Sequence, residues 1–350
     1  MIKPLDADKE IARLGQLIDQ SENIVVVTHM SPDGDAIGSS TAFRGVMETL
    51  GKDVRIVIPD MMLESLRKVP GSKEVIDAKR YPDFARKLIA DADLIVCLDF
   101  NTPERVAQLG KHILEAQAPK VLIDHHLHPA DFAEVTISRP EMSSTCYLLF
   151  KVLCALGLFP NLDRDTATDI LTGMMTDTGN FSYNASDPEI YVVVSELMKL
   201  GADKEGIYRH QFNTDSLDAI RLNSFALLER MKVWPEYGAA LIRLTREELN
   251  RFHYTKGDTE GLVNRPLAIP GIVYSMFMRE EDDYVKVSMR SLGEVPVNRM
   301  CADHFGGGGH LNAAGGEYRG TLDSAVELFK SLLKPNLKKY SKEIHDAKKL

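Results

Sequence analysis

The sequence predicts an α/β protein: an N-terminal, doubly wound and mainly parallel sheet, followed by a smaller C-terminal α/β domain. Two observations lead to this fold class. In the first half, short apolar runs such as residues 94–98 and 121–123 alternate with helical patterns, as in parallel sheets covered on both faces. After residue 239, strands that alternate apolar and polar residues follow instead. The 350 residues suffice for two hydrophobic cores.

Apolar periodicity and turn residues predict the elements in order. In the first half we expect helices over residues 11–18 and 36–50 and one that ends at 87–92, with strands over 24–28, 54–58, 94–98 and 121–123. Gly51 ends the second helix because glycine readily adopts the left-handed backbone that follows a helix. In the second half we expect helices over 143–156, 166–175, 188–200, 217–231 and 322–333, and strands over 240–244, 272–278 and 284–290.

These elements predict four segments along the chain. We expect a first domain over residues 1–185, a helical connector over 186–220, a second domain over 221–340 and a charged tail over 341–350. The tail is assigned because the last residues, KKYSKEIHDAKKL, are rich in charged side chains.

Composition excludes several classes of protein. The formal net charge of −9 argues against a broad basic surface for long nucleic acid, which needs many Lys and Arg contacts to phosphates. A small anionic ligand would need a local positive centre. No run of 18 uncharged apolar residues exists and the first residues lack the apolar core of a secretory signal, so we expect a cytoplasmic protein without membrane contact. The four cysteines show no CxxC pairing, which argues against a disulfide scaffold or a zinc site.

The stretch VVVTHMSPDGDAIGS, residues 25–39, has the composition of a binding site. A β-branched run leads into a Pro/Gly loop, and a helix begins at about Ala36. His29, Asp33 and Asp35 are three potential metal ligands within seven residues. They lie at the carboxyl end of a predicted strand, where open α/β sheets bind their ligands.

More potential ligands follow apolar segments far along the chain. Asp99 ends one strand, Asp124, His125 and His126 end another, and Asp177 follows a helix. We expect all of them at the same end of the sheet. Four clustered aspartates repel one another, by on the order of 4 kcal/mol for a pair ~4 Å apart at an effective dielectric of about 20. Two divalent cations would cancel this charge; a mixed Asp/His set suits Mn²⁺, with Mg²⁺, Co²⁺ or Fe²⁺ as alternatives.

Ordinary structural roles stay open for the same residues. An aspartate at the end of a strand often caps the next helix, which is an alternative for Asp99 and for Asp177. His125 and His126 could form a buried pair, although two adjacent imidazoles are hard to bury without partners. The complete set favours a metal centre because purely structural roles would require several independent coincidences. Two ions about 3.5–4 Å apart can share one carboxylate, for which we choose Asp99.

The motifs THMSPDGDAIGS, CLDFNTPERV, VLIDHH and MMTDTGNFSY, followed by FGGGGHLNAAGG, together resemble the DHH family of phosphoesterases with a C-terminal DHHA1 domain. Within that family the chain is most similar to the branch of nanoRNases and pAp phosphatases. The resemblance is specific because the order and the spacing of the motifs agree over nearly the whole chain. The GGGGH motif alone would be weak evidence for the resemblance.

The resemblance implies a role for each candidate residue. Asp99 would bridge two Mn²⁺ ions. Asp124 would orient an imidazole by a hydrogen bond, and His126 would face the scissile phosphate. The other ligands would divide between the two ions, with His29 and Asp33 on one, and Asp35, His125 and Asp177 on the other.

The glycine cluster at residues 306–309 precedes His310 and has its own chemistry. Glycine lets backbone N–H groups approach an anion closely, and His310 can donate to a phosphoryl oxygen. A flexible hairpin or a tight turn is the structural alternative. The resemblance implies that this loop binds substrate across the interdomain cleft, and that Arg290 grips a terminal phosphate. The implied substrate-binding residues are His126, Ser288, Arg290, Gly307, Gly308, Gly309, His310 and Asn312.

The resemblance implies a Mn²⁺-dependent phosphoesterase in which a metal-bridging hydroxide attacks phosphorus in the cleft. Expected substrates are short RNA oligomers, degraded to mononucleotides, and 3′-phosphoadenosine 5′-phosphate (pAp), which loses its 3′-phosphate. Linear or cyclic dinucleotides such as pApA or cyclic di-AMP come next. Three alternatives stay open: a RecJ-like single-strand exonuclease, a pyrophosphatase or exopolyphosphatase, and a nucleotide sensor with an inactive metal site. We expect no partner of long duplex nucleic acid, and the oligomeric state, a homodimer included, stays open.

Overall fold

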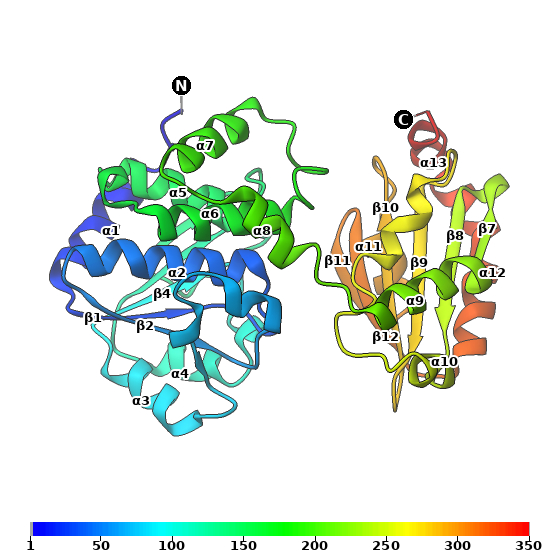
Figure 1. Cartoon of the computed structure of the whole chain (residues 1–350), viewed down its shortest axis with the longest axis horizontal. Helices are drawn as coiled ribbons and strands as arrows, with labels where there is room; N and C mark the ends of the chain where they lie inside the picture. The colour runs from blue at the N-terminus through cyan, green and yellow to red at the C-terminus, as the bar shows by residue number, and fades with distance from the viewer. Residues whose placement is uncertain (1–2, 350) are drawn as a thin grey trace. The chain divides into compact units, whose positions relative to one another are not determined.

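The computed structural model describes residues 3–349, which form two compact units that divide between Thr214 and Asp215. Each unit is built on its own six-stranded sheet with helices packed against it (Figure 1). The predicted α/β class with two domains is therefore confirmed. Among the described residues, no helix has both the length and the apolar character needed to cross a bilayer.

The sheet of the first unit is parallel and has the strand order β3-β2-β1-β4-β5-β6. In the centre of this sheet, Val26 pairs with Ile56 on one side and with Val96 on the other. The chain leaves β1 toward one edge and later returns to build the other, so the strand order reverses between β1 and β4. Ligands of open α/β sheets bind outside the carboxyl ends of the strands at such a reversal. The strands are β1 (Asn23–Val27), β2 (Asp53–Ile58), β3 (Ile76–Asp77), β4 (Leu94–Leu98), β5 (Lys120–Asp124) and β6 (Val135–Ser138).

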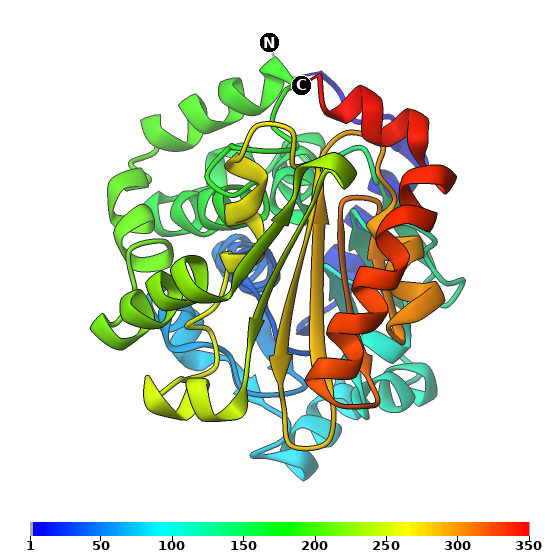
Figure 2. The same cartoon turned by 90° about the vertical axis from the view of Figure 1, so that its right-hand side faces the viewer.

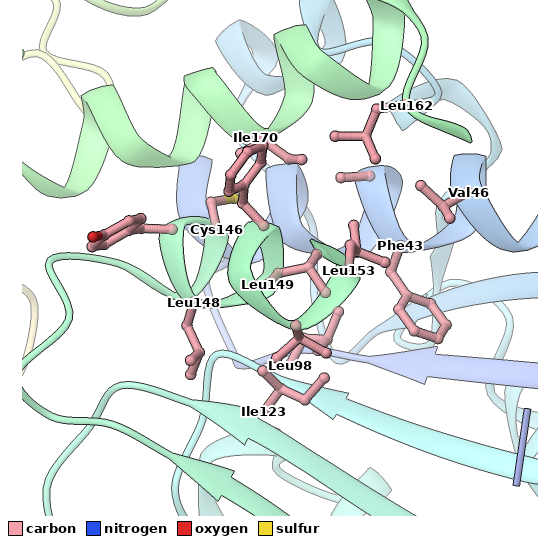
Figure 3. Packing of buried hydrophobic residues seen from close by; sticks show 14 of the residues in the cluster. Phe43, Val46, Leu98, Ile123, Cys146, Leu148, Leu149, Leu153, Leu162 and Ile170 are labelled. Atoms are coloured by element: carbon pink, nitrogen blue, oxygen red, sulfur yellow. The ribbon is translucent and has the colours of Figure 1, made fainter. Parts of the chain in front are cut away.

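Helices cover both faces of this sheet, which explains why its strands are apolar without alternation. Val26 points into the core beneath α1, α2, α5, α6 and α7, while its neighbour Val27 faces α3 and α4. Figure 3 shows the larger core, where Phe43 of α2 and Leu149 of α5 lie above Leu98 of β4. The helices are α1 (Asp8–Gln20), α2 (Gly34–Thr49), α3 (Pro82–Asp91), α4 (Leu109–Glu115), α5 (Thr145–Ala155), α6 (Arg164–Asp177), α7 (Pro188–Lys199) and α8 (Lys204–Gln211).

The sheet of the second unit has the order β11-β12-β10-β9-β8-β7 and is antiparallel except for the pair β8 and β9. Its strands are β7 (Met231–Trp234), β8 (Ala239–Leu244), β9 (Tyr274–Glu280), β10 (Val285–Ser291), β11 (Gly307–His310) and β12 (Ala313–Tyr318). Helices α11 (Val297–His304), α12 (Leu322–Lys339) and α13 (Ser341–Ala347) cover one face, and Figure 2 shows α12 lying along it. Helices α9 (Leu217–Phe225) and α10 (Arg246–Arg251) pack on the other face.

Two predictions about the C-terminal region are wrong. Residues 341–350 were expected as a charged tail, but residues 341–347 form α13, because Ile344 and Ala347 are buried in the core of the second unit. The glycine cluster was expected as a loop, but Gly307–His310 is the edge strand β11. Intrinsic propensity disfavours glycine in strands, and pairing with β12 outweighs that preference here.

The boundaries of the units also differ from those expected. Helices α7 and α8 lie within the residues predicted as a connector, 186–220, yet Val193 and Ile207 belong to the core of the first unit. The compact first unit therefore extends to Thr214. One α-helix was predicted over 217–231. The α-helix α9 ends at Phe225, and a short π-helix, Ala226–Arg230, follows it directly.

Candidate active site

His29 lies in the loop that follows β1 and is almost completely buried. Its Nδ1–H donates to the carbonyl oxygen of Met30 at 2.9 Å. This hydrogen bond turns Nε2 toward two carboxylates, 3.4 Å from Asp99 Oδ2 and 3.8 Å from Asp33 Oδ1. The loop therefore presents the imidazole in the tautomer that a metal ion needs.

Asp33 has two roles in this loop. Its side chain is half exposed, and Oδ1 accepts hydrogen bonds from the amides of Asp35 and Ala36, both at 3.0 Å. It is thus the N-cap of α2, which fixes the direction in which that helix leaves the site. The capping role that the sequence left open for Asp99 and Asp177 belongs instead to Asp33.

Asp99, directly after β4, lies between the other candidate ligands. Its Oδ2 faces His29, while Oδ1 is 3.7 Å from His125 Nε2. The residue is buried and has a positive φ of 64°, a strained backbone that aspartate tolerates better than most residues and that is common at functional sites. Asp99 thus adjoins both imidazoles, and its role as a bridging ligand stays a prediction.

His125 faces a second set of carboxylates. Its Nδ1–H donates to the carbonyl oxygen of Met142 at 3.2 Å, and Nε2 lies 3.1 Å from Asp177 Oδ2 and 3.9 Å from Asp35 Oδ2. Asp177 is the last residue of α6. Three groups with the ligand spacing of a metal site result: His29 with Asp33 and Asp99, Asp35 with His125 and Asp177, and Asp99 with His125 and His126.

His126 is held by Asp124, the last residue of β5. The carboxylate of Asp124 accepts from the backbone amide of His126 at 3.0 Å and from its Nδ1 at 2.7 Å. Asp124 is completely buried. The carboxylate thus fixes both the backbone and the ring of His126, which is the orienting geometry that the family resemblance implies for it.

Helix α5 holds two of the carboxylates, a contact that sequence reasoning missed. The amides of Thr145 and Cys146 donate to the two oxygens of Asp35, at 2.6 and 2.8 Å, and the Thr145 hydroxyl donates to Asp99 Oδ1 at 2.9 Å. These are the first amides of the helix, where its dipole favours negative charge. The N-cap Ser144 before an apolar run signals the start of the helix, but nothing local to that motif shows that Asp35 lies there.

The site is short of positive charge. Burial raises the pKa of Asp35 well above its ordinary value, and the nearby carboxylates of Asp99 and Asp177 raise it further. Burial also raises the pKa of Asp177, to about 6, although its hydrogen bond with His125 opposes the shift. Burial lowers the pKa of His125, but Asp177, Asp99 and Asp35 outweigh that effect and raise it to about 10. The protein without a metal would thus hold protons in place of cations.

The same geometry fits a metal ion. Because Nδ1 of His29 and of His125 donates to a backbone carbonyl, each Nε2 carries either a lone pair or an extra proton. A lone pair would face carboxylate lone pairs at 3.1–3.9 Å, which is repulsive unless something positive lies between them. The donor set of oxygen and imidazole suits Mn²⁺ and related divalent cations.

Several residues expected to bind substrate lie on one face of the second sheet. Ser288 pairs with Gly315, which pairs with Gly308; two positions along β10, Arg290 pairs with Ala313, which pairs with His310. Directly paired residues share a face of the sheet. Arg290 and His310 therefore lie on either side of Ala313, whose side chain is small. Ser288 and Arg290 are half-buried, and the four residues of β11 are exposed.

The other glycines of β11 and Asn312 contribute to structure. A Cβ at Gly307 or Gly309 would overlap backbone atoms of β12, so both positions need glycine for the strands to pair. At Gly308 a Cβ would meet no atom within 4 Å. The side-chain amide of Asn312 donates to Ser291 Oγ at 2.9 Å and to the carbonyl oxygen of Gly293 at 2.7 Å, so its NH₂ group holds the turn after β10.

The parallel sheet gathers three overlapping groups of carboxylates and imidazoles at its switch point. This arrangement fits a metal-dependent hydrolase, and two-metal centres are typical of phosphoesterases. Comparisons with known proteins agree. Residues 23–176 match the model of the DHH family, N-terminal domain, and residues 241–335 match that of the DHHA1 domain. The chain belongs to the DHH family and is a metal-dependent phosphoesterase.

Three known proteins resemble this chain over most of its length. The bifunctional oligoribonuclease and PAP phosphatase NrnA of Thermus thermophilus is 31% identical, and the match covers 87% of each chain. An exopolyphosphatase-related protein from Bacteroides fragilis, of known crystal structure, is 44% identical with a TM-score of 0.93, covering 97% of this chain and 98% of that one. The cyclic-di-AMP phosphodiesterase PdeA of Listeria monocytogenes is 26% identical over 86% of this chain and only 45% of its own length.

Proposed function

We propose that this enzyme uses two Mn²⁺ ions to hydrolyse short RNA oligonucleotides to mononucleotides and to remove the 3′-phosphate of pAp. The observation that carries the proposal is the convergence of six candidate ligands from distant parts of the chain on one end of the sheet. The NrnA relative supports this choice of substrates, because the match covers most of both chains. The six ligands are His29, Asp33, Asp35, Asp99, His125 and Asp177.

The proposal divides these ligands between two ions. His29 and Asp33 would hold one ion, Asp35, His125 and Asp177 would hold the other, and Asp99 would be shared between them. When bound, such an ion pair activates a water molecule as nucleophile at neutral pH and stabilises negative charge on the phosphoryl oxygens. Without it, the carboxylates would repel a phosphate.

The remaining residues of the site would act on the substrate. Asp124 accepts from Nδ1 of His126, so Nε2 of that ring would be directed at a phosphoryl oxygen and donate to it when protonated. In the second unit, Arg290 and His310 lie on either side of Ala313 and would bind the substrate's terminal phosphate between them. The backbone at Gly308 would lie near the same group, since a Cβ there would meet no atom within 4 Å.

A second candidate function is hydrolysis of cyclic di-AMP or of the linear dinucleotide pApA. The relative PdeA favours it, because the match includes 86% of this chain. The chain spans less than half of that protein, whereas it matches NrnA over most of the length of both chains, so NrnA is the better guide to substrate.

A substrate panel with Mn²⁺ tests the proposal. The purified chain would be incubated with 5′-labelled RNA of increasing length, pAp, pApA, cyclic di-AMP, pyrophosphate, tripolyphosphate and long single-stranded DNA. Short RNA and pAp should give the highest kcat/KM, and mononucleotides should be the product of RNA. Preference for pyrophosphate or tripolyphosphate would contradict the proposal, and preference for cyclic di-AMP would select the second candidate.

A further inference from the structure

We propose that an open pocket beside α8 binds a second nucleotide of a single-stranded RNA substrate, through its base and its phosphate. The proposal rests on the proposed function and names the part of the chain that would distinguish an oligonucleotide from a single nucleotide such as pAp. The pocket has a volume of about 350 Å³, within the range that small-molecule sites occupy. It is lined by Asn180, Lys204, Glu205, Tyr208 and Arg209, all in the first unit.

The pocket lies close to the candidate metal centre. Asn180, in its wall, follows the candidate ligand Asp177 by three residues, so their Cα atoms are at most about 11 Å apart. This upper bound keeps the wall within reach of a strand that is bound at the candidate metal centre. A strand whose phosphate lies at the metal centre could therefore place its neighbouring nucleotide in the pocket.

The wall of the pocket is held firmly to the end of α6, which carries Asp177. The amide of Asn180 donates to the carbonyl oxygen of Met175 at 2.7 Å, and the Thr178 hydroxyl accepts from the amide of Phe181 at 2.9 Å. Asn180 and Phe181 both have positive φ, 56° and 64°. Such backbone persists only where its surroundings enforce it, and it is concentrated at functional sites.

Helix α8 is equally well anchored. Ile207 is buried in the core of the first unit, on the side of the helix away from the pocket. Gln211 donates to the carbonyl oxygen of Ser65 at 3.0 Å, and Lys204 Nζ lies 3.4 Å from Asn180 Oδ1. The pocket is thus formed between two fixed segments, which lowers the entropy that a ligand would lose on binding.

The chemistry of the lining suits a nucleotide. Tyr208 is 39% exposed and stacks on Phe212 with ring centroids 5.4 Å apart and an interplanar angle of 16°. The outer face of Tyr208 can take a base, as aromatic platforms do in proteins that bind single strands. Lys204 and Arg209 offer positive charge to a phosphate, while Glu205 opposes it, so the lining carries a net charge of +1.

The test compares two substrates in variants of the pocket. The ratio of kcat/KM for a 5′-phosphorylated pentanucleotide to kcat/KM for pAp would be measured for the wild type, Tyr208→Ala, Arg209→Gln and Glu205→Gln. We expect Tyr208→Ala to lower the ratio about tenfold, through KM, and Arg209→Gln to lower it severalfold and to weaken its salt dependence. Glu205→Gln should raise the ratio, because it removes the opposing charge. An unchanged ratio, or an equal loss on both substrates, overturns the proposal.

Two controls complete the test. Arg80 and Tyr81 form an exposed cation–π pair elsewhere on the first unit, and Tyr81→Ala with Arg80→Gln should leave the ratio unchanged. If the wild type hydrolyses neither substrate, the proposed function fails, and fluorescence anisotropy with a labelled trinucleotide still decides the pocket. Weaker binding by Tyr208→Ala than by Tyr81→Ala would support the subsite, and equal binding would refute it.

Discussion

Asp99 owes its position to residues outside its own strand. The Thr145 hydroxyl donates to Oδ1, and Oδ2 faces His29, so both oxygens of the carboxylate are held in position. The two oxygens of Asp35 are fixed in the same way by the first amides of α5. A single helix terminus therefore orients the candidate bridging ligand and one candidate ligand of the second ion.

We predict that Thr145→Val weakens Mn²⁺ binding about tenfold or more, because the carboxylate of Asp99 loses the donor that orients it. Thr145→Ser keeps the hydroxyl and should bind Mn²⁺ almost as the wild type does. Calorimetric titration of each variant measures the dissociation constant. Equal affinities for the valine variant and the wild type would show that the hydroxyl does not position Asp99.

Gly308 and Gly307 are neighbours in β11 that would respond differently to an added side chain. A Cβ would meet no atom within 4 Å at Gly308 but would collide with the carbonyl oxygen of Gly315 at Gly307. We predict that Gly308→Ala keeps the wild-type Tm and raises KM severalfold, because the new methyl group occupies the place of a substrate phosphate. Gly307→Ala should lower Tm. A wild-type KM in a folded Gly308→Ala variant would exclude that position from the substrate site.

At the scale of elements, the close approach of α2, α5 and α6 brings the ligands of the second ion together. Asp35 is in the first turn of α2, and Asp177 ends α6. Glycine allows the approach: a Cβ at Gly173 would lie 2.2 Å from Cys146 Sγ and 2.6 Å from Asp35 Oδ1. The geometry of the site thus depends on how tightly the helices pack.

We predict that Gly173→Ala destabilises the protein by roughly 1–3 kcal/mol and weakens Mn²⁺ binding, because the added methyl group pushes Cys146 and Asp35 away from α6. Gly15→Ala in α1 is the control, since its Cβ would meet only Leu156 at an ordinary 3.5 Å. Chemical denaturation and Mn²⁺ titration check both variants. A wild-type stability in Gly173→Ala would show that these helices adjust freely.

The element scale also shows what could be predicted from the sequence. The strand that leads into Asp99 and the strand that ends in Asp124 were predictable because continuous apolar runs mark buried parallel strands. Strand β11 was not, because glycine has no local preference for a strand and only its pairing with β12 defines it. The contact between Asp35 and Thr145 joins residues 110 positions apart, and no local pattern encodes such a distance.

At the scale of the whole molecule, the chain is acidic, although a phosphoesterase must bind an anionic substrate. The net charge of −9 repels phosphates, and the candidate site adds buried carboxylates. Divalent cations would therefore determine both whether substrate binds and whether it reacts. Protons compete for the same groups, because they too can neutralise the site.

We predict that the affinity for Mn²⁺ falls as pH falls from 8 to 6. In the metal-free protein His125 has a pKa of about 10, so at neutral pH a cation must displace its proton, and each displaced proton weakens apparent binding tenfold per pH unit. Below about pH 6 Asp177 also takes up a proton, and the dependence should steepen. Titrations at several pH values check this, and a constant dissociation constant would contradict it.

The most direct test of a two-metal centre is anomalous diffraction at the manganese edge from crystals soaked in Mn²⁺. Two peaks should appear, one on each side of Asp99, with His29 and Asp33 at one and Asp35, His125 and Asp177 at the other. The Asp99→Ala variant should lose at least one of them. A single peak, or peaks away from these side chains, would contradict the account.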